Sequence, residues 1–166
     1  YKLNNIRKYR YQDDETFLSK EDIQSLLHAC KNPKHRLAIA LTYSCMLHVN
    51  ELVSIRIQDI DYTSSLINIV NKDNVIIRKV PFDSSIRPLL STYLKKVNPS
   101  YYLLESKPNQ KCSPASIYMA VETASIKARV QYNVNPQIIR RSAIFTLITH
   151  GVDISIIKTI LGHGEL

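Results

Sequence analysis

Two consecutive arginines lie in a segment that is otherwise almost entirely apolar. Residues 136–151 read PQIIRRSAIFTLITHG, and Arg140 shares a helical face with Ile144 and Leu147, four and seven residues further on. A guanidinium keeps its proton in proteins, so its burial on such a face must be offset by an anion. The sequence leaves two candidate anions for this guanidinium. One is a core carboxylate such as Glu51, and the other is a phosphate, which Arg binds through two parallel hydrogen bonds. A phosphate partner would suit catalysis on a phosphodiester.

A lysine stands between two β-branched runs. Residues 65–70 read SLINIV and residues 75–82 read VIIRKVPF, and the polar NKDN between them puts Lys72 on a hairpin turn. A solvated lysine on a mobile turn is the ordinary interpretation of this pattern. The alternative is a lysine that reaches a leaving oxygen and acts as a general acid.

The charge balance favours a polyanionic partner. The chain has 166 residues, with 22 Lys and Arg against 14 Asp and Glu, a net charge of +8. Nucleic acid is the usual partner of such a chain, and a merely basic soluble protein is the alternative. The sequence lacks GxxxxGK[ST], GxGxxG and HExxH motifs, and its three glycines leave little room for a phosphate-cradling loop.

The remaining composition predicts a single domain in a reducing, cytoplasmic setting. The three cysteines Cys30, Cys45 and Cys112 are odd in number and far apart, so they predict neither a metal site nor a disulfide framework. We expect Cys30 and Cys45 to pack in the core. No apolar run approaches about 20 residues, so no membrane partner is expected.

Periodicity predicts an α+β fold that is mainly α-helical, with a small antiparallel β-sheet, a hairpin, inserted. Residues 1–17 read as a basic lead-in or linker, and residues 18–166 as one domain. Ser19, Asp83 and Ser113 are expected helix N-caps. The expected elements are helices over 18–32, 33–47, 49–59, 83–97, 113–130, 135–151 and 153–163, the hairpin over 65–82, and a short extended piece within 98–106.

The order of these segments resembles the catalytic domain of the tyrosine recombinases, the phage integrase family. The family pattern is a GLRxSEL box followed by xWxDID, a GKGxKxRxVPL hairpin, HxLRHTxAT, GvdxxxIqxxLGH and then a nucleophilic tyrosine. The matching stretches here are LTYSCMLHVNELVSIRIQDID, the hairpin that ends in VPF, and PQIIRRSAIFTLITHGVDISIIKTILGHGEL. The resemblance covers about residues 18–166 and implies the fold of that domain.

Three positions match family residues, and the resemblance gives each a role. Arg140 falls on the second family arginine, which holds the scissile phosphate. Lys72 falls on the hairpin lysine, the implied general acid for the 5′-oxygen, and His163 falls on a position that hydrogen-bonds the phosphate and supports the nucleophile. Arg140, Arg141 and Lys72 are then the expected DNA-binding residues.

Two positions depart from the family pattern. His48 stands where the family has its first arginine, and Gln137 stands where it has its first His or Lys. Glu51 matches the family residue that helps to hold the first arginine. A histidine offers one donor where arginine offers a fork. The departures leave two functions open: a diverged enzyme, or a catalytically impaired DNA-binding paralogue of the same fold.

The implied reaction is site-specific DNA recombination or integration through a 3′-phosphotyrosyl intermediate. Cationic groups would stabilise the phosphorane, so the resemblance implies no metal and no cofactor. The implied partners are double-stranded DNA and further copies of the protein, in a tetramer on DNA. All ten tyrosines precede His163 and none stands at the family position. We therefore expect a C-terminally incomplete domain that is inactive alone, with no earlier tyrosine at the site.

Overall fold

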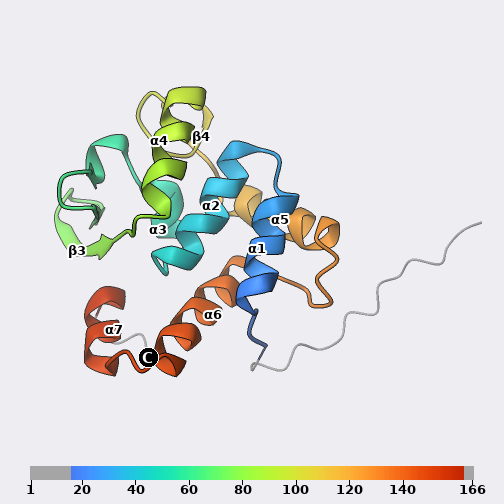
Figure 1. Ribbon diagram of the computed structural model, residues 1–166. Coiled ribbons are helices and arrows are strands. Elements are labelled where there is room, and N and C mark those ends of the chain that lie inside the picture. The colour runs from blue at the N-terminus through green and yellow to red at the C-terminus, as the bar shows by residue number, and fades with distance from the viewer. Residues whose placement is uncertain (1–15, 163–166) are drawn as a thin grey trace, which may run out of the picture.

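The helices and strands follow the predicted order. The structure is a computed structural model that describes residues 16–162, and it is mainly helical with small antiparallel sheets, as predicted (Figure 1). In chain order the elements are α1 (Lys20–Ala29), α2 (Pro33–Ser44), α3 (Val49–Ser54), the 3₁₀ helix η1 (Ile57–Asp59), β1 (Ile60–Asp61), β2 (Leu66–Val70), β3 (Ile76–Pro81), α4 (Ile86–Val97), β4 (Glu105–Lys107), β5 (Gln110–Lys111), α5 (Pro114–Lys127), α6 (Pro136–Thr149) and α7 (Ile154–Leu161).

Side-chain caps start the helices where the sequence predicts them. The Ser19 hydroxyl accepts the Asp22 N–H at 3.0 Å, and the Asp22 carboxylate accepts the Ser19 N–H at 3.0 Å, which is a capping box. Ser113 caps α5, with Pro114 at the first helical position. Each cap satisfies a backbone donor that the first turn of a helix leaves without an internal partner.

Several helix ends lie up to five residues inside the expected bounds, and two of these differences have a local cause. The helix expected over 49–59 ends at Ser54 and is followed by η1, because Ile55 adopts an extended conformation and the Asp59 carboxylate accepts the Arg56 N–H instead. The helix expected from residue 83 begins at Ile86. Asp83 still caps it, since its carboxylate accepts the Ile86 N–H at 3.2 Å, but Ser85 occupies the N-cap position.

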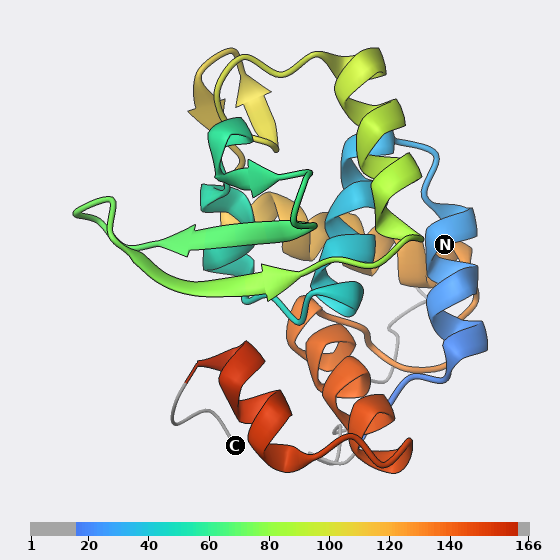
Figure 2. The ribbon, with the colours of Figure 1, turned by 60° about the vertical axis from the view of Figure 1, so that its left-hand side comes forward.

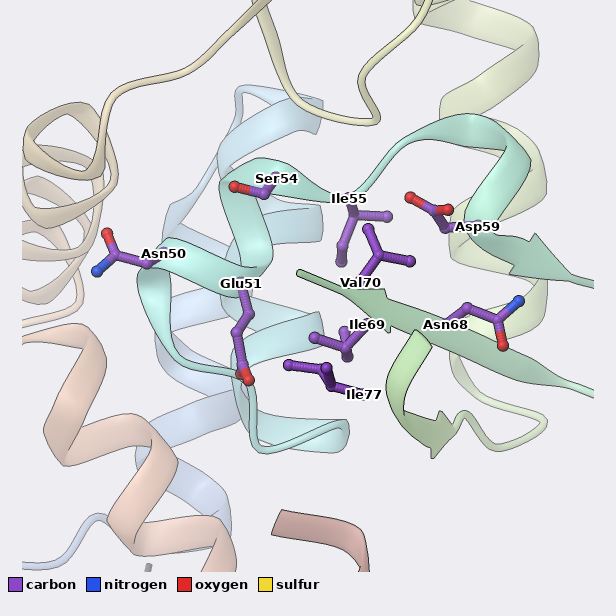
Figure 3. Close-up of a pocket in the computed structure, with 9 residues that line it drawn as sticks. All are labelled: Asn50, Glu51, Ser54, Ile55, Asp59, Asn68, Ile69, Val70 and Ile77. Carbon is purple, nitrogen blue, oxygen red and sulfur yellow. The ribbon is translucent and has the colours of Figure 1, made fainter. Parts of the chain in front are cut away.

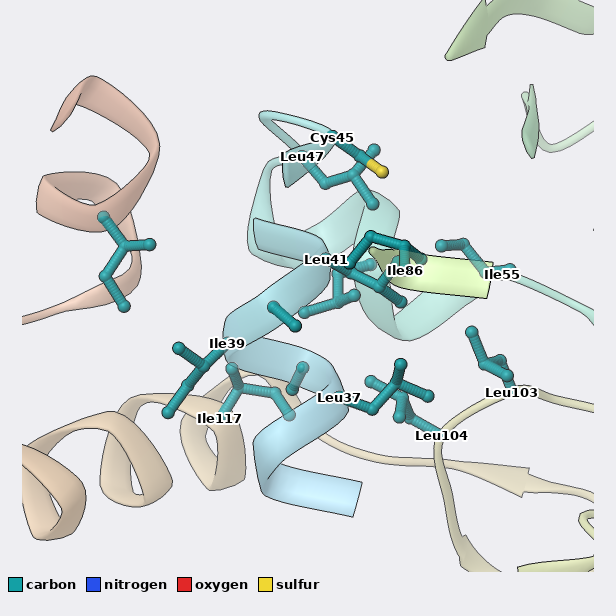
Figure 4. Packing of buried hydrophobic residues seen from close by; sticks show 14 of the residues in the cluster. Leu37, Ile39, Leu41, Cys45, Leu47, Ile55, Ile86, Leu103, Leu104 and Ile117 are labelled. Carbon is teal, nitrogen blue, oxygen red and sulfur yellow. The ribbon is translucent and has the colours of Figure 1, made fainter. Parts of the chain in front are cut away.

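The core is built around α2, whose sequence is mostly apolar after Arg36. Residues 37–42 of α2 are all buried, and α4, α5 and α6 pack around this helix. Figure 4 shows Leu37, Ile39 and Leu41 of α2 beside side chains of α4 and α5. Cys30 and Cys45 lie in the same core, as predicted, and burial raises the pKa of the Cys45 thiol to about 12.

The predicted hairpin forms the inserted sheet. Its strand order is β1-β2-β3, with antiparallel pairing such as Ile67 with Val80, and the register shifts near the turn between Ile69 and Val70. Figure 2 shows the β2–β3 turn projecting beyond the helices, with α7 beside β3. The extended piece predicted within 98–106 overlaps β4 at Glu105 and Ser106, and β4 pairs with the unpredicted β5.

Phe17 and Leu18, which precede α1, contact α6. Phe17 stacks on Phe145 with ring centroids 4.1 Å apart, and the Leu18 N–H donates to the Ser142 hydroxyl at 2.8 Å. This start of the described chain is therefore fixed to the helix that carries Arg140. None of the helices within residues 16–162 is long and apolar enough to cross a membrane.

Candidate functional site

A pocket of about 440 Å³ opens where the start of α3, the side of α5 and the first turns of α6 meet. It gathers His48, Gln137 and Arg140, three of the five predicted catalytic residues, although up to 92 residues separate them along the chain. Its lining residues are Leu47, His48, Val49, Asn50, Glu51, Tyr118, Pro136, Gln137 and Arg140.

Arg140 forms a buried part of the pocket wall. The residue is 8% exposed, and its Nε donates to the Met46 carbonyl at 2.7 Å. Because the guanidinium is planar, this bond fixes the orientation of the whole group. Met46 presents its carbonyl from a left-handed backbone conformation, with φ of 51°. The pocket arginine is thus held by backbone from the loop that joins α2 to α3.

Glu51, which the sequence offers as a partner of Arg140, has a different ion-pair partner. The Glu51 carboxylate accepts Arg78 Nη2 at 2.5 Å and Arg78 Nε at 3.1 Å. It also accepts the His48 N–H at 2.9 Å, which fixes the backbone of His48 at the N-cap of α3. Glu51 therefore holds the hairpin arginine and positions the pocket histidine.

Arg78 was missed by reasoning from the sequence. It lies on β3 and also donates through Nη1 to the Ile160 carbonyl near the end of α7. Figure 3 shows its partner Glu51 on α3, close to Ile69 and Ile77 of the sheet, in a second pocket of about 170 Å³. One signal was available in the sequence. Alternate residues of a strand point to the same face, so Arg78 faces the same side as buried Val80. A cation that faces inward needs an anionic partner.

Gln137 lies in the first turn of α6 and is exposed. The Asn135 side chain caps this helix by accepting the Ile138 N–H at 2.9 Å, and Pro136 takes the first helical position. The pocket therefore lies at the N-terminal end of a 14-residue helix. The helix dipole and the positive charge of Arg140 both favour an anion at that end.

Tyr118 of α5 also lines the pocket. The expectation that no earlier tyrosine is placed to attack phosphorus stays a prediction, and Tyr118 is the residue on which to test it. Its place on α5 follows from the helical period, since Ile117 and Val121 face the core and turn Tyr118 toward the pocket side. Only the approach of α5 to α6 in the folded chain brings this tyrosine beside Arg140.

Lys72 and Arg141 lie outside the pocket, and His163 lies outside the described residues. Lys72 is exposed on the β2–β3 turn. Within the turn, the Asn71 side-chain oxygen accepts the N–H groups of Asp73 and Val75, at 2.9 and 3.0 Å. Within residues 16–162, no group of three or more His, Cys, Asp or Glu residues is arranged to hold a metal ion.

Comparison with solved structures places this architecture among the tyrosine recombinases. The crystal structure of XerA recombinase superposes with a TM-score of 0.81 at 23% identity, covering 90% of this chain and 57% of that one. XerH site-specific recombinase bound to its difH substrate gives a TM-score of 0.76 at 20% identity, covering 90% of this chain and 47% of that one. The helical domain with its inserted hairpin is therefore the fold of a recombinase catalytic domain.

The sequence comparison identifies the family. The model of the phage integrase family matches residues 16–166, and this chain belongs to that family. Tyrosine recombinase XerA of Pyrococcus horikoshii is 29% identical over 153 residues, covering 90% of this chain and 53% of the relative. A tyrosine recombinase of Pseudothermotoga lettingae is 28% identical with the same coverage. The chain thus spans about half the length of the curated relatives it matches.

Proposed function

We propose that this chain is the phosphate-binding catalytic domain of a site-specific DNA recombinase. Residues 18–166 would form the domain, and residues 1–17 would lead into it. The observation that carries the proposal is the pocket that gathers His48, Gln137 and Arg140 at the N-terminal end of α6. Double-stranded DNA is supported as the partner by the relatives, which are named tyrosine recombinases, and by XerH, which was solved bound to its difH substrate.

In this proposal the pocket binds the scissile phosphate. Arg140 and His48 donate to its non-bridging oxygens, and Gln137 adds a neutral donor. A tyrosine of the parent protein, following His163, attacks phosphorus and forms a 3′-phosphotyrosyl bond as the bond to the 5′-oxygen breaks. Cationic donors stabilise the charge that develops on the phosphorane. The 5′-hydroxyl of a partner strand then reverses the step, in an assembly that we propose to be a tetramer.

Lys72 supplies the proton for the leaving 5′-oxygen in this scheme. The lysine is exposed on the β2–β3 turn, and this turn projects beyond the helices (Figure 2). In our proposal, duplex DNA bound at the pocket extends to the turn. A positioned general acid contributes about 10²–10⁴-fold to the rate.

A substrate with sulfur in place of the bridging 5′-oxygen tests this assignment in the parent protein. A thiolate leaves without a proton, because the thiol pKa of about 8.5 is far below that of an alcohol. We expect Lys72→Ala to slow single-turnover cleavage of ordinary DNA at least about 100-fold and to regain the wild-type rate on the sulfur substrate. Equal slowing on both substrates would refute the role of Lys72 as the acid.

The second candidate is a DNA-binding paralogue that has lost catalysis. His48 favours it, because the pocket has a histidine where the family pattern has an arginine. Such a protein would bind the sulfur substrate and leave it intact. The same assay therefore separates the two functions, provided that a gel-shift control shows binding.

A further inference from the structure

A chain of hydrogen bonds joins the turn that carries Lys72 to the body of the domain. Within the turn, the Asn74 N–H donates to the Asn71 carbonyl at 3.1 Å, and Asn74 has a left-handed φ of 60°. The Asn74 side-chain oxygen points out of the hairpin and accepts Arg56 Nη1 at 2.7 Å. Among residues 16–162, this is the one side-chain hydrogen bond that links residues 71–75 to an element outside the hairpin.

Arg56 is itself held in a fixed orientation. Its Nε and Nη2 donate to the two oxygens of Asp59, at 2.8 and 2.7 Å, and Asp59 is 4% exposed. The bond to Asp59 raises the pKa of Arg56, so the group stays cationic. Two of the three guanidinium nitrogens thus bind a buried carboxylate, and the third points to Asn74. A planar, doubly anchored group is a rigid donor.

Packing gives the turn little other support. Val75, Ile76 and Ile77 are 56%, 47% and 59% exposed, and the strand register shifts between Ile69 and Val70. The apolar residues at this end of the hairpin therefore contribute little burial that would fix its angle to the domain.

We propose that Arg56 is a positioning residue that sets the place of Lys72 by tethering the hairpin turn through Asn74. The inference rests on the proposed function, since it assumes that Lys72 is the general acid. Arg56 lies on the body of the domain, in the segment between α3 and β1, and does not touch DNA phosphate in this scheme. Its effect on the reaction is confined to the step in which Lys72 gives a proton to the leaving 5′-oxygen.

Three variants test the tether in the parent protein. Asn74→Gly removes the acceptor and keeps a residue that tolerates a positive φ. Asn74→Asp keeps an acceptor at the same place and also tolerates that φ. Asp73→Gly is the matched control, because it adds glycine freedom to the same turn and leaves the Arg56–Asn74 bond intact.

We expect Asn74→Gly to slow single-turnover cleavage of ordinary DNA roughly 10- to 100-fold, the range that a small misplacement of a catalytic group produces. The sulfur-bridged substrate should restore the wild-type rate. Asn74→Asp and Asp73→Gly should cleave ordinary DNA at the wild-type rate. A wild-type rate for Asn74→Gly, or equal slowing on both substrates, would overturn the inference. If the sulfur-bridged substrate does not restore the cleavage rate of Lys72→Ala, the proposed function itself is contradicted.

A measurement on the 166-residue chain tests the tether without cleavage. Amide hydrogen exchange over residues 71–75 should rise at least tenfold in Asn74→Gly and stay near wild type in Asn74→Asp. The rise in Asp73→Gly should be smaller than in Asn74→Gly. Equal exchange in the two Asn74 variants would contradict a tether through this side chain.

Discussion

The side chain at position 48 decides how many donors can reach a phosphate in the pocket. His48 brings one ring donor, whereas an arginine would bring a fork beside Arg140. We expect His48→Arg in the parent protein to raise the single-turnover cleavage rate by up to about 100-fold, the value of one donor at a developing oxyanion. An unchanged rate with an unchanged melting temperature would mean that the site is organised around histidine or is inactive.

Arg140 has a structural role as well as the proposed binding role. Arg140→Ala would leave the buried Met46 carbonyl without its donor, which costs about 1–3 kcal/mol of unfolding free energy. The variant should also lose most of the phosphate-dependent DNA binding at the pocket. Urea denaturation measures the first effect and a binding titration at fixed salt measures the second.

Gln137→Ala is the matched control for Arg140→Ala, since Gln137 is exposed on the same helix. Its unfolding free energy should stay within about 0.5 kcal/mol of wild type. A loss of stability in Arg140→Ala well above about 3 kcal/mol would indicate a buried ion pair in place of a carbonyl bond.

At the scale of elements, Arg78 joins three of them: β3, the first turn of α3 and the end of α7. Its side chain is 7% exposed and that of Glu51 is 18% exposed. Arg78→Met keeps the apolar stem and leaves Glu51 without its cation, which should cost about 3 kcal/mol of unfolding free energy. Lys79→Met changes the exposed neighbour and should cost under about 0.5 kcal/mol.

The same pair of variants reports on α7. Because Arg78 holds the Ile160 carbonyl, amide exchange in α7 should accelerate in Arg78→Met and not in Lys79→Met. Equal exchange in both variants would mean that packing against β3 alone keeps α7 in place.

Local sequence signals predicted the elements well, because local interactions form them. The Ser19 capping box, the Ser113–Pro114 start and the NKDN turn each depend on residues within four positions. The β4–β5 pair escaped prediction because it is organised by Glu105, whose carboxylate accepts the N–H groups of Ser100, Tyr101, Tyr102 and Asn109. Its two short strands carry no periodic pattern that would mark them as a sheet.

The site was predictable where a residue is locally conspicuous or a motif marks it. Arg140 was found from its place on an apolar helical face, His48 and Gln137 were found through the family pattern, and the fold brings the three together. Arg78 and Tyr118 were missed, because their roles depend on contacts with residues 27 positions away or on a neighbouring helix. Sequence separation of this kind leaves no local signal for side-chain partners.

At the scale of the whole molecule, the net charge of +8 should make DNA binding steeply dependent on salt. Each phosphate neutralised contributes about −0.9 to the slope of log K against log salt. We expect the 166-residue chain to bind a labelled duplex with little sequence preference, with affinity falling at least about tenfold between 50 and 200 mM salt. An affinity that is flat in salt would contradict a surface that binds mainly through phosphate.

The 166-residue chain should form no covalent adduct on a nicked suicide substrate. Attack needs a hydroxyl within about 3–3.5 Å of phosphorus and in line with the leaving oxygen. Tyr118 is the tyrosine to test, because it lines the pocket from α5. A denaturation-resistant protein–DNA band that disappears in Tyr118→Phe would show that Tyr118 can attack; a band that persists would point to another tyrosine.

The attachment of the chain's entry to α6 gives the domain a mechanical property. Phe17 stacks on Phe145, and Leu18 is hydrogen-bonded to Ser142, two residues beyond Arg140. A pull on the backbone at Thr16 would therefore act on α6 through these two contacts, as well as on α1 through the chain itself. The N-terminal end of this helix, at Pro136 and Gln137, lines the pocket. We expect tension at Thr16 to reach the pocket through α6, because that helix carries Arg140 and its first turn lines the pocket.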